Sequence, residues 1–165
     1  MRAAIAAAAI VVAAVIASII SPPPLRVIWN TTASTTIGLY LVSQTKPARG
    51  DLLVVRLPRE MELLAVTRGL LALRTPVLKP VAAIVHDRVC RFDSVISVNG
   101  RVAAIARRVD QQGRPLPTWR GCRRLAPSQV FLLARHPHSF DSRYFGPVGL
   151  HLARGIARPL LTFAD

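Results

Sequence analysis

Residues 3–20, AAIAAAAIVVAAVIASII, constrain the fold most, because they contain no charged residue and a single hydroxyl, that of Ser18. As an α-helix they would span about 27 Å, close to the thickness of the hydrocarbon core of a bilayer. A buried helix of a soluble domain and a signal peptide cleaved near AVIAS are the alternatives. We favour a single, retained N-terminal transmembrane helix, which the residues SPPP at 21–24 end at the polar boundary.

Arg2 precedes this segment and favours an N-terminus on the cytoplasmic side, with the remaining residues outside. We therefore predict two parts: a membrane anchor with a Pro-rich hinge at 1–24, and one folded domain at 25–165. A chain of 165 residues is long enough for that domain to bury a core of its own.

The hydrophobic pattern of this domain is mostly that of strands, so the fold class we predict is mainly β with one short helix. Residues 38–43 and 51–57 flank the turn KPARGD and are expected to form a β-hairpin. Residues 94–106 contain an Asn-Gly pair between two apolar runs, which is the strongest hairpin signal in the chain.

The expected helix covers residues 58–73, where apolar residues recur at helical spacing. Pro58 lies near its start and acidic residues occupy its first turn, as is typical of a helix N-terminus. Leu63, Leu64, Val66, Leu70 and Leu71 make up the predicted apolar face. The rest of the domain is predicted to contain strand-like segments at 76–90 and 129–134 and polar loops at 110–122 and 135–148.

The formal net charge of +14 has an unusual source, because 20 of the 22 basic residues are arginine. Such a charge could bind nucleic acid or anionic lipid through phosphate groups, and coding bias could also account for it. The arginines are scattered, with no run longer than the pairs at 107–108 and 123–124, and few aromatic residues lie among them. We therefore expect contact with the anionic membrane surface and no nucleic-acid binding.

Cys90 and Cys122 are the only cysteines, and both follow the apolar segment. Outside the membrane, in an oxidising compartment, they could form a disulfide, and two buried free thiols are the alternative. Two cysteines cannot complete a zinc site by themselves, and these two do not have CxxC spacing.

A serine hydrolase needs a base that can be neutral near its working pH, and histidine is the usual one. The chain has four histidines, at positions 86, 136, 138 and 151. The sequence HPH at 136–138 could bind a metal, but proline fixes the spacing of its histidines and no third ligand is evident. We therefore expect solvated loop histidines there, and neither a metal nor a cofactor.

Lysine is the other candidate base, because arginine cannot lose its proton in a protein whereas a buried lysine can. Lys46 lies in the turn QTKPARG, where we expect it to be solvated. Lys79 lies within PVLKPVAAIV, whose apolar residues would favour the neutral amine. A lysine that snorkels from a strand edge is the alternative.

Four sequence blocks follow the apolar segment in order: NTTASTTIGLY at 30–40, RGDLLVV at 49–55, LKPVAAIVHD at 78–87 and SFDSRYFGPV at 139–148. They resemble the motifs of the signal peptidase family of membrane-anchored Ser/Lys peptidases. They are most similar to its TraF-type branch, which matures proteins of conjugative transfer systems. The resemblance runs from the apolar segment to residue 163 and implies a signal-peptidase-like β catalytic domain.

By this resemblance Ser34 is the nucleophile and Lys79 is the general base that accepts its proton. The family pattern also implies an oxyanion hole formed by the Ser34 N–H and the Thr32 hydroxyl. This assignment accounts for the unusual density of small hydroxyl residues at 30–36.

The same resemblance gives the block at 139–148 a supporting role. Ser139 would hydrogen-bond the lysine amine, and Asp141 with Arg143 would form an ion pair that helps to orient the site. A surface salt bridge between Asp141 and Arg143 is the alternative.

Two positions depart from the family pattern. Thr36 stands where the family usually has proline, so the loop after Ser34 is less rigidly set. His86 stands where a glycine normally allows unusual backbone angles. Neither departure removes a predicted catalytic group.

The sequence thus predicts a single-pass serine endopeptidase of the bacterial inner membrane with a periplasmic catalytic domain. Its expected partners are an exported precursor protein, such as a pilin or a signal-bearing chain, the cytoplasmic membrane and a conjugative secretion system. A catalytically silent component of a secretion or pilus apparatus, with the same fold and anchor, is the alternative. Residues Ser34, Thr32 and Lys79 favour the enzyme.

Overall fold

The computed structural model describes residues 5–8, 10–13, 15, 27–32 and 35–163. The predicted membrane segment at 3–20 lies partly outside these residues, and the hinge at 21–24 lies wholly outside them. Among the described residues, no helix is both long and apolar enough to cross a membrane.

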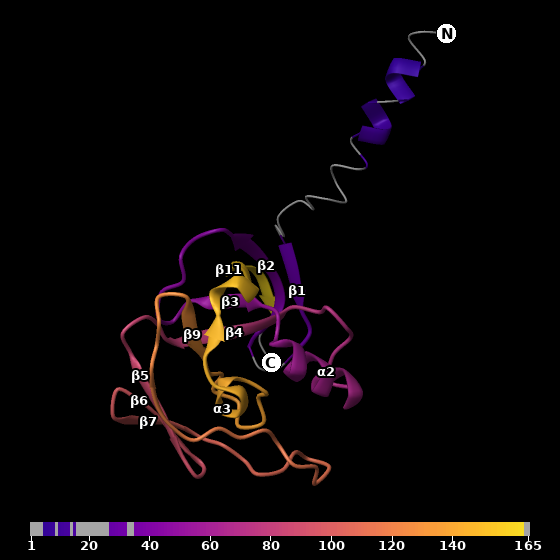
Figure 1. The fold of residues 1–165 in the computed structure, drawn as a ribbon. Coiled ribbons are helices and arrows are strands. Elements are labelled where there is room, and N and C mark those ends of the chain that lie inside the picture. Colours follow the sequence, from indigo (N-terminus) through magenta and orange to yellow (C-terminus); the bar gives the residue numbers. More distant parts are fainter. Residues whose placement is uncertain (1–4, 9, 14, 16–26, 33–34, 164–165) are drawn as a thin grey trace.

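The larger of two β-sheets has seven antiparallel strands in the order β1-β2-β11-β3-β4-β9-β10 (Figure 1). This sheet makes the domain mainly β, as the hydrophobic pattern predicts. Its strands are β1 (Val27–Asn30), β2 (Ile37–Ser43), β3 (Leu52–Val55), β4 (Val77–Ala83), β9 (Gln129–Leu132), β10 (Val148–Gly149) and β11 (Ala153–Phe163).

The predicted hairpin between 38–43 and 51–57 is wrong, although both segments contain strands. The C-terminal strand β11 lies between β2 and β3, so that Ala157 pairs with Val42 on one side and with Leu52 on the other. Hairpin prediction depends on local alternation and turn residues. These signals cannot reveal a third strand that comes from the other end of the chain.

The smaller sheet has four strands in the order β7-β6-β5-β8. A disulfide joins Cys90 of β5 to Cys122 of β8, so the alternative of two free thiols is wrong. The predicted hairpin at 94–106 is confirmed, since Asn99 and Gly100 both have positive φ angles, as a type I′ turn requires. The end of the predicted loop at 110–122 instead begins a strand, because pairing with β5 orders it. The strands are β5 (Arg88–Phe92), β6 (Val95–Val98), β7 (Arg101–Ile105) and β8 (Gly121–Arg124).

The helix α2 (Arg59–Thr67) begins close to its predicted start but ends well before residue 73. Among residues 35–163, two further short helices are present, α3 (Ser142–Phe145) and the 3-10 helix η1 (Leu150–Leu152). The expectation of one short helix is therefore incomplete. Elements of three or four residues are too short to show a helical period in the sequence.

The buried face of α2 differs from the predicted apolar stripe. Glu62 and Ala65 are buried, whereas Leu63 is 48% exposed. The Glu62 carboxylate accepts the backbone N–H of Arg74 at 2.7 Å and forms an ion pair with Arg56 at 3.2 Å. Polar contacts therefore help to hold this side of the helix, and Leu63 remains exposed.

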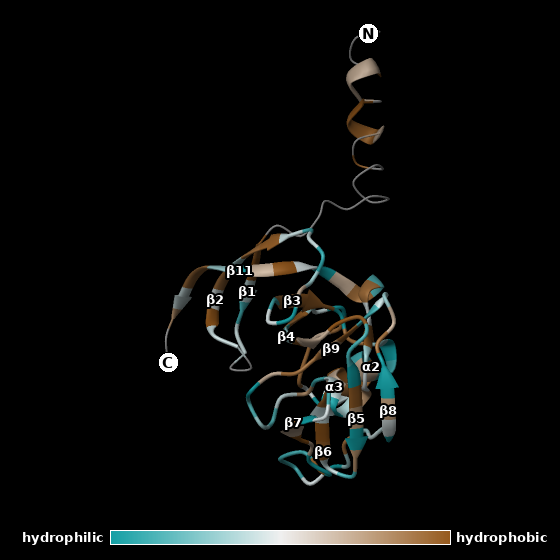
Figure 2. Ribbon diagram, turned by 90° about the vertical axis from the view of Figure 1, so that its left-hand side faces the viewer, coloured by the Kyte–Doolittle hydropathy of each residue, from teal (hydrophilic) through white to brown (hydrophobic). Residues whose placement is uncertain are grey.

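Buried apolar side chains form three clusters. On β3, Leu53 and Val55 belong to one cluster and Val54 to another, so the larger sheet is covered on both faces at this strand. The third cluster includes Val89 and Ile96 and packs the inner face of the smaller sheet against β9. Figure 2 shows that the two sheets differ in hydropathy, with β3 of the larger sheet hydrophobic and β8 of the smaller sheet largely hydrophilic.

Candidate active site

Lys79 lies within β4, a central strand of the larger sheet, and pairs with Leu53 of the neighbouring strand β3. Its side chain is 6% exposed, and Nζ donates a hydrogen bond to Ser139 Oγ at 2.7 Å. The alternative of a lysine that snorkels from a strand edge is therefore wrong. Lys46 is exposed, as the sequence predicts.

Burial is the main cause of an unusual pKa at Lys79. Removal of the amine from water disfavours its charged form and lowers the pKa from 10.5 to about 8, while the nearby Asp141 carboxylate opposes this shift and Arg143 adds to it. At pH 8 about half of the amine is therefore neutral, whereas an exposed lysine would be almost fully protonated.

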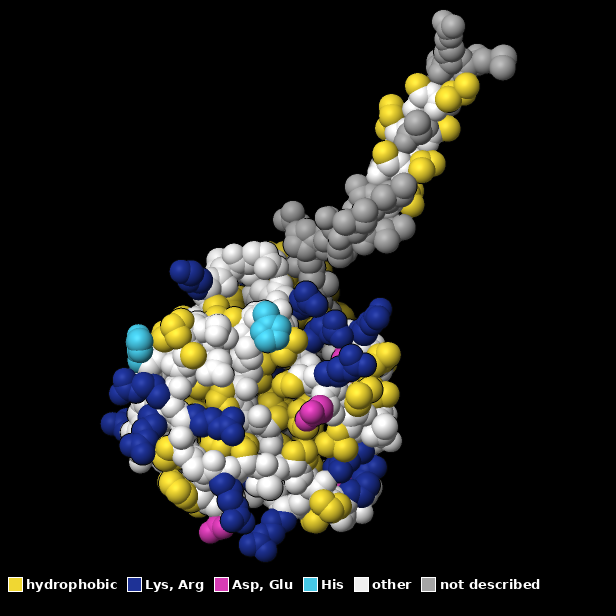
Figure 3. Space-filling model, in the orientation of Figure 1, with side chains coloured by type: hydrophobic (Ala, Val, Ile, Leu, Met, Phe, Trp, Pro, Cys, Tyr) yellow, Lys and Arg dark blue, Asp and Glu magenta, His cyan; other side chains and the backbone are white. Residues whose placement is uncertain are grey.

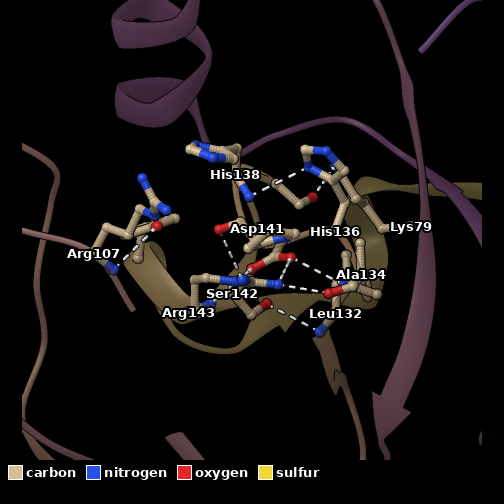
Figure 4. A network of polar contacts seen from close by, with 12 residues as sticks. Lys79, Arg107, Leu132, Ala134, His136, His138, Asp141, Ser142 and Arg143 are labelled. Atoms are coloured by element: carbon tan, nitrogen blue, oxygen red, sulfur yellow. Dashed lines mark hydrogen bonds and ion pairs between the residues drawn. The ribbon is translucent and has the colours of Figure 1, made fainter. Parts of the chain in front are cut away.

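Asp141 and Arg143 form a buried ion pair, so the alternative of a surface salt bridge is wrong. Arg143 Nε lies 2.8 Å from Asp141 Oδ1, and neither side chain is more than 2% exposed. The Asp141 carboxylate also accepts the backbone N–H groups of Ala134 and Arg143, at 3.0 and 3.1 Å (Figure 4). Arg143 Nη2 donates to Ala134 O at 2.6 Å. These bonds fix the loop that carries Ser139.

Asn30 is an important residue of this region that has no predicted role. Its side-chain amide donates to the carbonyl oxygens of Thr32, Thr35 and Thr36 at 2.9, 3.1 and 3.0 Å. Its Oδ1 accepts the Thr32 N–H at 3.2 Å and the Thr32 hydroxyl at 2.9 Å. One buried side chain thus clamps both ends of the loop at 31–36. Its place as first residue of the motif at 30–40 was the available signal.

Ser34, the predicted nucleophile, lies outside the described residues. Thr32, the predicted oxyanion donor, is exposed at the near end of the same loop. Thr32, Lys79 and Ser139 line one cavity of about 290 Å³. The structure therefore brings together three of the residues that the sequence singled out.

The walls of this cavity are largely apolar. Leu57 precedes α2, Ala65 is on its buried face, and Leu70 and Leu71 lie in the turn that follows it. Val77 of β4 completes the apolar lining next to Lys79. Such walls exclude water from the amine and offer space for small apolar side chains. We refer to this cavity as the Lys79 pocket.

His136 and His138 lie at the edge of the Lys79 pocket. Their ring centroids are 5.7 Å apart, and the backbone N–H of His138 donates to His136 Nδ1 at 3.3 Å (Figure 4). Both are exposed. Across the described part of the chain, no group of three His, Cys, Asp or Glu side chains is placed to hold a metal ion.

The two departures from the family pattern have clear local consequences. Thr36 contributes its carbonyl oxygen, which accepts from Asn30 and, at 2.7 Å, from the Tyr40 hydroxyl. His86 adopts a φ of 72°, a left-handed conformation in which glycine is favoured. The backbone therefore keeps a glycine-like turn at His86 despite its side chain.

Asp87, next in the chain, connects the two sheets. Its carboxylate accepts hydrogen bonds from Arg49, Asn99 and the backbone N–H of Ile84, at 2.6, 2.8 and 2.8 Å. Desolvation would raise the pKa of Asp87, but these hydrogen bonds outweigh it and hold the pKa below its usual value. In the motif at 78–87 only Lys79 has a predicted catalytic role, so Asp87 is a structural residue that sequence reasoning missed.

Basic side chains are spread over the face shown in Figure 3 and do not form one continuous band. This distribution agrees with the scattered arginines of the sequence.

Comparisons with known proteins agree with the motifs. The family model described as "Signal peptidase, peptidase S26" matches residues 1–161. Plasmid transfer protein TraF of Escherichia coli is 30% identical over 146 residues, which cover 81% of this chain and 82% of that protein. The probable conjugal transfer protein TraF of Sinorhizobium fredii is 34% identical over 148 residues, covering 82% and 77%.

A solved structure of a signal peptidase I from Enterococcus faecalis aligns with a TM-score of 0.40 at 22% identity. That alignment covers 69% of this chain and 98% of the other. The family model and the TraF relatives carry the assignment: this chain belongs to the signal peptidase family, peptidase S26, and is of the TraF type.

Proposed function

We propose that this protein is a membrane-anchored serine endopeptidase in which Ser34 is the nucleophile and Lys79 the general base. The observation that carries the proposal is Lys79 itself, a buried amine with a pKa lowered to about 8, at the wall of a pocket that Thr32 also lines. A structural lysine gains nothing from such burial, because desolvation destabilises its charged form.

In the proposed reaction, neutral Lys79 accepts the proton of the Ser34 hydroxyl as its oxygen attacks the scissile carbonyl carbon. Ser139 supports this step, because its hydrogen bond to Nζ restricts the direction of the amine lone pair. The Asp141–Arg143 pair acts one step further away by holding the loop of Ser139 in place.

The oxyanion of the tetrahedral intermediate would be held by the Ser34 N–H and the Thr32 hydroxyl. The Thr32 hydroxyl points to Asn30 Oδ1 in the free protein, so it must rotate to donate to the oxyanion. Protonated Lys79 then gives its proton to the leaving amine. Water opens the acyl-enzyme in hydrolysis, and an amine of a peptide opens it in transpeptidation.

The substrate we propose is an exported precursor protein with small residues before the cut, such as a pilin or another protein of a conjugative transfer system. The names of the TraF relatives support a role in transfer. The apolar segment at 3–20 would anchor the chain in the cytoplasmic membrane, with residues 25–165 in the periplasm, where they could contact the transfer apparatus.

The proposal is tested with the full chain in detergent, incubated with candidate pilin and signal-bearing precursors. We expect a shortened product from wild type and none from Ser34→Ala. Ser128→Ala is the matched control, since Ser128 is an exposed serine outside the motifs, and it should cleave like wild type. Equal cleavage by Ser34→Ala would remove Ser34 from the mechanism, and no cleavage by wild type would favour a silent structural component.

The anchor is tested separately by N-terminal sequencing of the mature protein from its membrane fraction. We expect the first twenty residues to be retained, because the apolar segment has membrane length and a proline stop. A mature N-terminus near residue 21 or 22 would show a cleaved signal peptide instead.

A further inference from the structure

A second cavity, of about 130 Å³, adjoins the Lys79 pocket. The two share Leu70, His138 and Phe140, so the edge of one continues into the other. Arg107 lies on the far side of this second cavity, which we call the Arg107 cavity. Figure 4 shows Arg107 and Lys79 on opposite sides of the polar network that surrounds Asp141.

The Arg107 cavity has a rigid aromatic floor. Phe140 follows Ser139 directly and stacks on Tyr144, with ring centroids 5.9 Å apart and an interplanar angle of 17°. Tyr144 is 2% exposed, and its hydroxyl accepts the backbone N–H of Arg107 at 3.3 Å. Ser139, which positions Lys79, is therefore joined to the wall that carries Arg107 through the packed rings of Phe140 and Tyr144.

The charges of this cavity are not balanced. Arg68 forms an ion pair with Asp110 at 3.2 Å and donates to Pro115 O at 2.6 Å. Asp110 is also bound by Arg114 at 2.7 Å, so its carboxylate is shared by two arginines. The Arg107 guanidinium forms no ion pair with any carboxylate of the described residues.

His138 does not offset this excess of positive charge. Partial desolvation and the nearby Arg107 lower the pKa of His138, so its imidazole is neutral at physiological pH. With Arg68 and Asp110 cancelling, Arg107 leaves the cavity with one uncompensated positive charge.

We propose that the Arg107 cavity is a substrate subsite that binds a carboxylate of the peptide, either an acidic side chain or a chain terminus. The inference rests on the proposed function and adds the chemistry of one substrate position to it. The peptide would run from the Lys79 pocket past His138 and Phe140. Its methylene groups would lie on the aromatic rings and its carboxylate would pair with the Arg107 guanidinium, whose planar donors match that group.

The test uses the full chain in detergent and precursor peptides that carry Glu or Gln at each position on either side of the cut. Wild type should cleave the Glu peptide about fivefold better in kcat/KM at one position, the size expected of a partly exposed ion pair. Arg107→Gln should lose this preference. Arg108→Gln is the matched control, because it removes the same charge from the next residue, outside the cavity, and should keep the preference.

Two further arms identify the source of the carboxylate and the partner charge. If a chain terminus is bound, the Glu and Gln peptides should be cleaved alike, and amidation of the peptide C-terminus should lower cleavage by wild type but not by Arg107→Gln. If an acidic side chain is bound, Arg107→Glu should reverse the preference and favour a Lys peptide over the Glu peptide. A wild type that shows neither a Glu preference nor a loss of cleavage on amidation, relative to Arg107→Gln, would overturn the subsite.

Failure of the subsite and failure of the proposed function give different results. If wild type cleaves all peptides equally, the amidated ones included, the peptidase assignment stands and the subsite is wrong. If wild type cleaves none, the peptidase assignment fails, and fluorescence anisotropy of the same labelled Glu, Gln and amidated peptides then decides the subsite. About fivefold tighter binding of the Glu peptide, or of the peptide with a free C-terminus, to wild type but not to Arg107→Gln would support it, and equal binding of all of them would overturn it.

Discussion

The two sheets of this protein differ in how many of their faces are buried. At its central strand β3 the larger sheet is covered on both faces, since neighbouring residues of β3 belong to different hydrophobic clusters. The smaller sheet packs one face inward through Val89 and Ile96 and leaves the other exposed, with Phe92 63% and Ile105 56% accessible. Its disulfide lies on that exposed side, in line with Phe92 along β5.

The larger sheet therefore suits chemistry that needs a side chain removed from water, whereas the smaller sheet gives mechanical support. A lysine on a sheet that is buried on both faces loses its water and with it part of its proton affinity, which is the state of Lys79. On the smaller sheet, Arg88 and Arg124 are exposed, and the buried Arg91 donates a hydrogen bond to Arg143 O. The covalent link occurs in the sheet with less buried area, where packing alone contributes less.

The largest expected effect is on the larger sheet, from Lys79→Arg. Guanidinium keeps its proton and cannot accept the one on Ser34, so precursor cleavage should fall by about 10² to 10⁴-fold. Lys46→Arg makes the same change at an exposed lysine and should cleave like wild type. Circular dichroism checks that both variants fold. A folded Lys79→Arg that cleaves at the wild-type rate would show that the Ser/Lys assignment is wrong.

The next effect concerns the smaller sheet, from replacement of Cys90 and Cys122 by alanine. The bond closes a loop of about 31 residues, and in the chain-entropy model its loss costs roughly 3 to 4 kcal/mol of unfolding free energy. Denaturant unfolding measures this loss, and cleavage at low temperature should remain close to wild type because Lys79 lies on the other sheet. Thiol labelling that modifies both cysteines in unreduced, denatured wild type would contradict the bond.

A smaller loss is expected from Thr32→Val, which removes one oxyanion donor and should reduce kcat by about 10²-fold. Thr32→Ser keeps the hydroxyl and serves as the control. Because the Thr32 hydroxyl is also a partner of Asn30, thermal melting should show whether the loop has loosened. If Thr32→Val turns over at the wild-type rate, Thr32 has no part in the mechanism.

The smallest expected effect is the change of cleavage rate and stability with pH, which tests the burial of Lys79 on the larger sheet. Only neutral Lys79 is competent, so the rate should rise about tenfold per pH unit at acidic pH and level off above the lysine pKa of about 8. Stability should follow the same sign: between about 8 and 10.5 the unfolded chain binds more protons at this lysine, so unfolding free energy rises with pH. A rate that is flat from pH 6 to 9 would contradict Lys79 as the base.

Local features of this fold were predictable and long-range ones were not. The hairpin at Asn99–Gly100 follows from two residues that tolerate positive φ, and it was predicted correctly. The burial of Lys79 was expected from its neighbours in the sequence. The insertion of β11 and the clamp of Asn30 over its loop depend on where distant backbone groups lie, which no local pattern encodes.

The identity of Ser139 as the partner of Lys79 came from motif resemblance rather than from spacing. The two residues are separated by 60 positions and meet because β4 and β9 pair and the Asp141–Arg143 ion pair fixes the loop after β9. Physical reasoning from sequence could identify a lysine that is easily deprotonated. It could not identify the hydroxyl to which the lysine donates its hydrogen bond.

The position of β11 has a consequence for the time at which the candidate active site is assembled. β1 and β2 carry the loop clamped by Asn30, whereas β3 and β4 carry Lys79, and residues 153–163 are the strand that joins these two halves of the sheet. During synthesis this strand leaves the ribosome after all the others. The two halves can therefore meet only when translation has passed residue 163, so a partly made chain would hold the loop clamped by Asn30 and Lys79 apart.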